Sequence, residues 1–283
     1  MKKNLLLKCL SLGMMGLSVA CTSERSIDEQ FPKDEGSASG KIVLDLSADA
    51  RFIEQTRAVN EDDYRNTANY TVQLWNNEDP TKLLVNCKYS ELNDNMPGAF
   101  KPGKYTAKAF YGKEVNCSRN EFYVEGINEN INVTAGNPTK VTLPCTPTAG
   151  KLSVTFSSDM ATYYNNYEVV FSQAAALAGS SVTWSATDTE PFYVKLNAAG
   201  ETLRYTINLT AKEDYAYTDK EGNKKTNGTV TKEFTLQRNR SYHLTIKPAY
   251  TATTEGGLNI IIVIDEDTND PIDIPVQVPI DWL

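Results

Sequence analysis

Histidine, the side chain most often used as a general base, occurs once in this sequence, at His243. Serine and cysteine nucleophiles both need a positioned base, and no Gly-x-Ser-x-Gly motif accompanies His243. This histidine stands in a run of alternating apolar and polar residues, so we expect a strand residue with structural contacts. The sequence therefore predicts a protein that is not an enzyme, with a hydrolase dependent on His243 as a remote alternative.

Acidic residues near the C-terminal end have the opening spacing of a calcium loop, at Asp265, Asp267 and Asn269. The pattern then fails, because Asp270 stands where the loop needs glycine and Val276 stands where it needs a bidentate glutamate. We therefore expect a solvated acidic turn rather than a calcium site.

Carboxylates also cluster at Glu61, Asp62 and Asp63. Glycoside hydrolysis needs two carboxyl groups across a cleft, and the simpler interpretation of this run is a charged, solvated loop. The scattered cysteines and the single histidine lack zinc-ligand spacing, and no phosphate loop or dinucleotide fingerprint occurs. We expect no metal and no cofactor.

Aromatic residues are frequent, with 15 Tyr and 3 Trp, and aromatic faces can bind sugar rings and apolar patches. Tyr is also a good strand residue. Trp184 shares the phase of Val182, which favours the core, whereas Trp75 has the opposite phase to Val72 and Leu74. Trp75 is therefore the candidate for an exposed aromatic that contacts a ligand.

The N-terminal stretch has a basic start followed by a mostly apolar segment that ends in Leu17-Ser18-Val19-Ala20-Cys21. This layout is typical of a secretory signal, and its end resembles a bacterial lipobox, in which the cysteine is acylated, with palmitate among the chains, and becomes the new N-terminus. Ser18 occupies the place where the lipobox usually has leucine. We predict a signal peptide at 1–20 and lipidation at Cys21; the alternative is an ordinary secretory signal with a chance cysteine.

Charge and hydropathy limit the partners of the remaining chain. Loss of Lys2, Lys3 and Lys8 with the signal takes the formal net charge from −8 to −11. This acidic balance argues against nucleic acid and against adsorption to anionic lipid. No later apolar run is long enough to span a bilayer, so we expect the membrane contact to be the lipid on Cys21, preceding a polar tether at 21–40.

Three cysteines, Cys87, Cys117 and Cys145, follow the lipidation position. An odd number allows at most one internal disulfide, and an envelope compartment permits one. The spacing does not select a pair, and three buried thiols are an equal alternative.

Period-two alternation recurs along the whole chain and indicates an all-β protein of the sandwich or barrel type. We predict two tandem β-sandwich domains at 41–147 and 148–283, joined near Thr146–Gly150. Glu121–Val124 and Ile131–Thr134 are expected as separate strands around a turn at Gly126. The remaining strands are expected at 41–47, 70–75, 83–89, 105–111, 140–145, 152–157, 167–171, 182–184, 192–196, 203–211, 229–236, 242–247, 258–264 and 272–278.

Some details of these elements are more specific. The segments 229–236 and 242–247 are expected to pair as a hairpin across Gln237–Arg240. A turn is also expected at Pro144. Because proline removes a ladder donor, Pro275 indicates that the last strand lies at a sheet edge or leaves the sheet. Short helical turns are expected near Glu61–Asn66 and within Gln173–Gly179.

Several short segments together resemble the fimbrillin-like surface lipoproteins of Bacteroidetes-type bacteria, and most closely an uncharacterised lipoprotein family among them. They are the lipobox at Cys21, Thr56-Arg57-Ala58, Pro102–Gly112, Val141–Cys145, Lys151–Phe156, Tyr167–Phe171 and Gly257–Asp265. The resemblance implies tandem β-sandwich domains and a structural or adhesive protein of the cell envelope. Such a protein is lipid-anchored, at the outer membrane and at the surface.

In pilus-forming relatives, a precursor is cut after an arginine in an early loop, the first strand is lost, and the next subunit donates a strand. Removal of a central strand exposes backbone groups and an apolar slot that a donated strand refills. The resemblance assigns the cut to Arg57, with Arg51 as second choice; the alternative is that Arg57 is a solvated loop residue. Expected partners are the membrane and other pilus-type subunits, and a host or glycan ligand if the chain is instead a glycan-binding lipoprotein accessory to nutrient uptake.

Overall fold

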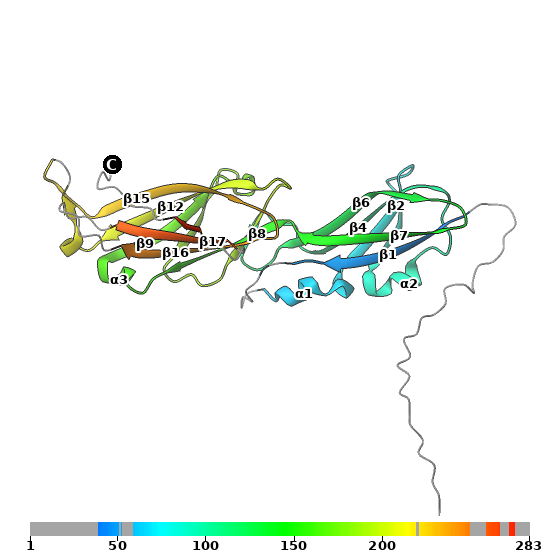
Figure 1. The fold of residues 1–283 in the computed structure, drawn as a ribbon, viewed down its shortest axis with the longest axis horizontal. Coiled ribbons are helices and arrows are strands. Elements are labelled where there is room, and N and C mark those ends of the chain that lie inside the picture. Colours follow the sequence, from blue (N-terminus) through cyan, green and yellow to red (C-terminus); the bar gives the residue numbers. More distant parts are fainter. Residues whose placement is uncertain are drawn as a thin grey trace, which may run out of the picture. The chain divides into compact units, whose positions relative to one another are not determined.

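The computed structural model describes residues 39–50, 52, 59–218, 221–249, 259–266 and 272–274, and Figure 1 shows the fold as a ribbon. Strands make up most of these residues, and each helix among them is a short turn. The predicted all-β fold class is confirmed. The predicted signal peptide and nearly all of the predicted tether, including Cys21, lie outside the described residues.

The first half of the chain alternates strands with short helical turns. Its strands are β1 Lys41–Ala48, β2 Thr71–Asn76, β3 Leu83–Lys88, β4 Gly103–Gly112, β5 Cys117–Ser118, β6 Tyr123–Val133 and β7 Pro138–Pro147. Its helical turns are α1 Glu61–Arg65, η1 Thr67–Asn69, η2 Tyr89–Glu91 and α2 Leu92–Asn95. The helical turn predicted near Glu61 is confirmed as α1.

The second half continues in the same way. Its strands are β8 Ala149–Phe156, β9 Tyr164–Ser172, β10 Val182–Ser185, β11 Phe192–Lys195, β12 Glu201–Ala211, β13 Tyr217–Thr218, β14 Lys224–Lys225, β15 Asn227–Leu236, β16 Ser241–Ala249, β17 Asn259–Glu266 and β18 Ile272–Ile274. Its helical turns are α3 Met160–Tyr163, η3 Ala175–Leu177 and η4 Glu213–Tyr215.

Three large sheets hold most of these strands. Their strand orders are β1-β7-β6-β4-β2-β3, β10-β9-β12-β15 and β18-β17-β16-β8-β11-β5, and β13 pairs with β14 alone. β18 is the edge of its sheet, as the proline that follows it predicted. β5 and β11 pair although they come from different halves of the chain.

Buried apolar side chains form two clusters. One is drawn from 42–149 together with Tyr193, and the other is drawn from 152–246. The alternation is clear in β12, where every second residue from Leu203 to Ala211 is buried. Only Thr148 separates β7 from β8, and Tyr193 crosses the predicted boundary, so the division into 41–147 and 148–283 stays a prediction.

β1 is an edge strand, not the central strand that the sequence analysis assumed for the early segment. It runs parallel to β7, in register from Lys41 opposite Pro138 to Ala48 opposite Cys145. β7 pairs with β6 only near its C-terminal end, at Pro147 and Thr146. Within the described residues, β1 is therefore the ladder partner of β7 from Pro138 to Cys145.

Two predicted turns are wrong. Gly126 lies inside the continuous strand β6. A Cβ at this position would stand 2.6 Å from the Pro144 carbonyl oxygen and 2.9 Å from Cys145 Sγ, which explains why the residue is glycine. The glycine permits close approach of β7 rather than a turn. Pro144 itself lies within β7, opposite Ser47.

The predicted hairpin between β15 and β16 is also wrong. β15 pairs with β12, whereas β16 pairs with β8 in parallel and with β17. The connection leads from one sheet to another. Within it, Asn239 has a φ of 57° and donates its backbone N–H to the Ala149 carbonyl at 2.9 Å, which holds the connection beside the start of β8. The short linker therefore joins two layers instead of two neighbouring strands.

Two glycines with similar backbone angles allow a matched test of packing, Gly112 with φ 84° and Gly136 with φ 81°. A Cβ on Gly112 would collide with the Phe122 carbonyl oxygen and lie 2.7 Å from Tyr64 Cε1, whereas nothing lies within 4 Å at Gly136. Gly136→Ala is expected to lower the free energy of unfolding by about 1–2 kcal/mol. Gly112→Ala is expected to cost roughly 1–3 kcal/mol more. Urea denaturation measures both, and equal losses would contradict the close packing at Gly112.

Candidate functional site

The alternation of buried side chains in β1 continues beyond the end of the strand. Ile42, Leu44 and Leu46 face the core, and Ala50 and Phe52 continue the same alternation after β1 has ended. No strand was predicted between residues 47 and 70. The burial of Ala50 and Phe52 instead extends the packed surface of β1 to Phe52, whose side chain is 0% exposed.

Phe52 packs in an aromatic group. Its ring centroid lies 5.1 Å from that of Phe122 and 5.4 Å from that of Tyr193, and Phe122 and Tyr193 are 4.6 Å apart. Tyr64, from α1, stacks on Phe122 at 3.9 Å. The aromatic group thus brings together β11, α1, the segment that follows β1 and the residue that precedes β6.

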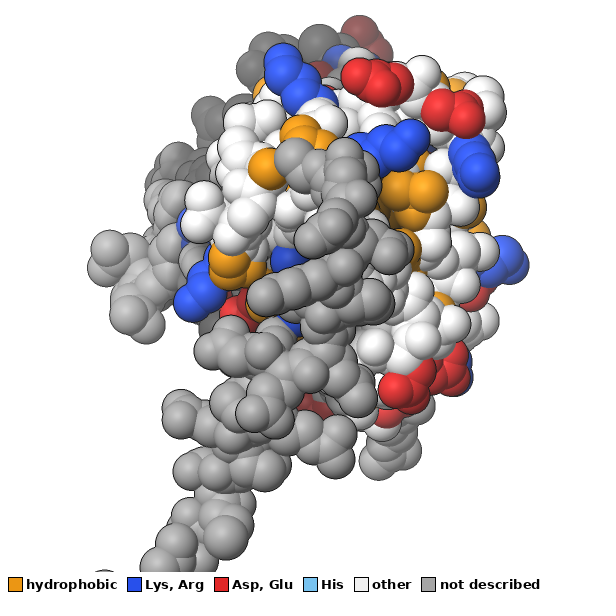
Figure 2. Space-filling model, turned by 90° about the vertical axis from the view of Figure 1, so that its right-hand side faces the viewer, with side chains coloured by type: hydrophobic (Ala, Val, Ile, Leu, Met, Phe, Trp, Pro, Cys, Tyr) orange, Lys and Arg blue, Asp and Glu red, His pale blue; other side chains and the backbone are white. Residues whose placement is uncertain are grey.

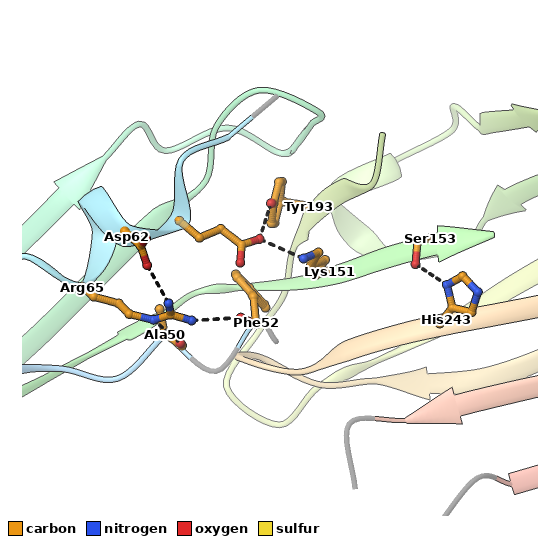
Figure 3. A network of polar contacts seen from close by, with 9 residues as sticks. Ala50, Phe52, Asp62, Arg65, Lys151, Ser153, Tyr193 and His243 are labelled. Atoms are coloured by element: carbon orange, nitrogen blue, oxygen red, sulfur yellow. Dashed lines mark hydrogen bonds and ion pairs between the residues drawn. The ribbon is translucent and has the colours of Figure 1, made fainter. Parts of the chain in front are cut away.

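A buried ion pair lies beside this aromatic group. Lys151 Nζ is 2.9 Å from Glu61 Oε1, and Tyr193 donates its hydroxyl proton to the same oxygen at 2.7 Å. Figure 3 shows the Lys151 and Tyr193 side chains converging on this carboxylate beside Phe52. Glu61 is 1% exposed and Lys151 is 4% exposed. The second carboxylate oxygen, Glu61 Oε2, is buried and has no hydrogen-bond partner among the residues that the structure describes.

The expected solvated loop at Glu61–Asp63 is wrong for its first residue. Glu61 begins α1 and lies three positions before the buried Tyr64, and residues with that spacing share a helix face. This spacing could have indicated that Glu61 is buried. Asp62 behaves as expected, because it forms an exposed pair with Arg65 at 2.8 Å.

Side chains also hold the backbone after β1. Arg65 donates from Nε to the Ala50 carbonyl at 3.3 Å and from Nη2 to the Phe52 carbonyl at 3.0 Å, as Figure 3 shows. Asn239 Nδ2 donates to the Asp49 carbonyl at 2.8 Å. Contacts from both halves of the chain therefore fix the path of this segment.

Of the site residues predicted from the sequence, the structure describes Trp75. Cys21, Arg51 and Arg57 lie outside the described residues. Trp75 is half-buried, in the opposite phase to the buried Val72 and Leu74, as predicted. Trp75 does not belong to the polar cluster around Glu61, and that cluster was not predicted as a site from the sequence.

The three cysteines are free thiols in the structure. Burial raises the pKa of Cys145 to about 12 and that of Cys117 to about 11, and it also raises the pKa of Cys87. A raised pKa lowers the thiolate fraction and therefore the reactivity. Their environment fits small apolar packing residues.

His243 lies within β16, and its Nδ1 is 2.8 Å from Ser153 Oγ on the neighbouring strand β8. It is a strand residue with a structural contact, as predicted. Among the described residues, no group of three or more His, Cys, Asp and Glu side chains could hold a metal ion. In the same part of the chain, every helix is too short or too polar to cross a bilayer.

Figure 2 shows one face of the molecule, on which hydrophobic side chains form small, separate patches between basic and acidic residues. Taken with the buried cluster, the described residues define an all-β protein of packed sheets whose first strand is held at a sheet edge. The chain belongs to the family described as a domain of unknown function, DUF4493, whose model matches residues 38–280. No curated protein matches the sequence.

Similar solved structures come from species of Bacteroides and Porphyromonas. A proposed adhesin from Bacteroides ovatus has a TM-score of 0.41 and 11% identity, covering 81% of this chain and 95% of that chain. Proposed polysaccharide-binding proteins from Bacteroides thetaiotaomicron give 0.43 and 13%, covering 81% and 96%. The fimbrial anchor protein Mfa2 from Porphyromonas gingivalis gives 0.39 and 9%, covering 83% and 99%.

The buried ion pair makes a direct stability prediction. Lys151→Met leaves the Glu61 carboxylate buried without its cation, so we expect a loss of about 3–5 kcal/mol in the free energy of unfolding at neutral pH. Lys195→Met is the matched control, because Lys195 pairs with Glu114 at 37% and 57% side-chain exposure, and we expect it to cost less than about 1 kcal/mol. Combining Lys151→Met with Glu61→Gln should recover part of the loss. Similar losses for both lysine variants in urea denaturation would contradict the buried pair.

Proposed function

We propose that this chain is a non-enzymatic cell-envelope lipoprotein, anchored through Cys21, that acts as a fimbrillin-like structural or adhesive subunit. In this proposal the chain is cut near Arg57, loses β1, and accepts a strand from a neighbouring subunit. The single observation that carries it is the β1–β7 ladder: β1 lies at a sheet edge and is the described partner of β7 from Pro138 to Cys145. Loss of β1 would expose a row of unpaired backbone groups that another strand can bind.

The apolar side chains of β1 explain why the cut segment would stay in place until it is replaced. Ile42, Leu44 and Leu46 are buried, as is Phe52 after the strand. Full burial of each such side chain is worth about 1.5–3 kcal/mol. A cut alone therefore leaves a packed strand, and an incoming strand with similar side chains would be needed to displace it.

The neighbours of Arg51 argue against a cut at that position. Ala50 and Phe52 are buried on either side of Arg51, and Arg65 binds both of their carbonyl groups. A protease must draw several residues of backbone into its cleft, and held backbone resists this. Arg57 is separated from this fixed segment along the sequence.

The N-terminus of protein recovered from the cell envelope tests the proposal by mass spectrometry. We expect a lipidated Cys21 on the precursor, loss of membrane anchoring in Cys21→Ala, and a new N-terminus at Ala58 in assembled material. Arg57→Ala should keep the precursor intact, and Arg51→Ala, the control, should be processed as in the parent chain. Surface material that retains 41–57 and forms no higher assemblies would overturn assembly by strand exchange.

A glycan-binding role is the second candidate, and the outer face of one sheet favours it. Trp75 shares this face with Gln73, which lies opposite Lys108 in the neighbouring strand. Lys108 Nζ lies 5.7 Å from the Phe110 ring centroid and 5.6 Å from that of Tyr123. Half-buried aromatic rings on a sheet face are suited to flat contacts with other rings.

A glycan array separates this role from a purely structural one. If the face binds glycan, Trp75→Ala should lower binding by at least about tenfold, since hot-spot aromatics are typically worth 2 kcal/mol or more. Tyr215→Ala is the control, because Tyr215 is an exposed aromatic in η4. No binding by the parent chain, or equal binding by both variants, would remove this candidate.

A further inference from the structure

We propose that the residues around Phe52 form a selective socket for the strand that replaces β1, so that the incoming strand must present an aromatic side chain at the Phe52 position. We call this group, Phe122, Tyr193, Lys151 and Arg65, the Phe52 socket. The proposal rests on the proposed function and adds the chemistry of the partner: an extended segment of a neighbouring subunit with alternating apolar residues and a terminal aromatic.

Side-chain size together with burial singles out the last position of the segment. Ile42, Leu44 and Leu46 are 2%, 9% and 7% exposed, and Phe52, which is 0% exposed, is the largest of the side chains in the same phase. Large aromatic side chains dominate the energetics of interfaces when they fill a closed pocket. Phe52 is therefore the position at which the segment places one large ring in a fully enclosed site.

The walls of the socket explain why an aromatic ring fits it. Phe122 meets the Phe52 ring edge to face, at an interplanar angle of 84°, and Tyr193 meets it at 53°. Lys151 Nζ lies 6.0 Å from the ring centroid, which allows a cation–π contact. An aliphatic side chain would offer neither the edge-to-face packing nor the ring face toward the ammonium group.

The backbone contacts around the socket are independent of the sequence of the strand. Arg65 donates to the carbonyl groups of Ala50 and Phe52, Asn239 donates to that of Asp49, and the Asp49 N–H donates to the Cys145 carbonyl at 2.9 Å. Any extended segment supplies these carbonyl groups and an N–H group. Backbone hydrogen bonds then give affinity for a strand in general, and the side-chain pocket gives selectivity.

An empty socket would be costly because of the ion pair beside it. Lys151 of the Glu61–Lys151 pair lies beside the Phe52 ring, and within the described part of the chain Glu61 Oε2 already lacks a hydrogen-bond partner. Removing Phe52 without replacement would leave a void against buried charges, which neither packing nor full solvation stabilises. The incoming strand therefore needs a ring here and not merely a small residue.

The test uses the full chain with a specific protease sequence in place of residues 53–58, cut in vitro. A fluorescent peptide with the sequence of residues 39–52 is exchanged into the cut protein, and unlabelled peptides compete with it. Phe52→Ala in the competitor should weaken it roughly 100- to 1,000-fold, and Phe52→Trp should stay within about tenfold. Val43→Ala is the matched control; Val43 is only half-buried, so its effect should stay within roughly threefold.

A second readout does not need exchange. In cut chains labelled on the N-terminal segment, that segment should separate at a lower urea concentration for Phe52→Ala than for the parent or Val43→Ala. Equal competition by the parent and Phe52→Ala peptides, with equal separation in urea, would overturn the socket. Selective peptides would support it even if no processing occurs in cells, so its outcome is separate from that of the proposed function.

Discussion

The parallel ladder between β1 and β7 is the interaction on which the first sheet depends. The ladder pairs of β7 with β6 are at Pro147 and Thr146, and within the described residues the backbone of β7 from Pro138 to Cys145 is paired through β1. An unpaired strand next to an apolar core is both costly and open to other strands. The same ladder that completes the fold thus determines where a foreign strand could bind.

The buried cluster at Glu61 shows a second constraint, which concerns specificity more than stability. Replacing a buried ion pair with apolar residues is often neutral or stabilising, whereas removing one partner is strongly destabilising. Glu61 from α1, Lys151 from β8 and Tyr193 from β11 must therefore be assembled together or not at all. This requirement links the segment that follows β1 to strands of the second half.

Much of the fold followed from period-two alternation, which located most strands, and the proline after β18 indicated its edge position. The errors arose where a local signal has two physical meanings. Gly126 indicates a turn or a close approach, and the partner strand β7 decides between them. The short connection after β15 indicates a hairpin or a change of sheet, and the contact of Asn239 with Ala149 decides.

The site was less predictable, because it joins residues that are far apart in the sequence. Nothing local links Phe52 to Tyr193 or Glu61 to Lys151, and an acidic run is normally solvated. Only the spacing between Glu61 and Tyr64 carried a hint. Lipidation at Cys21 was inferred from a contiguous motif instead, and it stays a prediction.

The parallel direction of β1 and β7 also has a mechanical consequence. In a parallel pair, the N-terminal end of β1 and the C-terminal end of β7 lie at opposite ends of the ladder. A pulling force that enters at Gly40 and leaves at Thr148 would act along the strands and load their hydrogen bonds in shear. Bonds in shear share the tension and break together, unlike bonds that are unzipped one at a time. The arrangement is suited to a protein held at one end and loaded at the other.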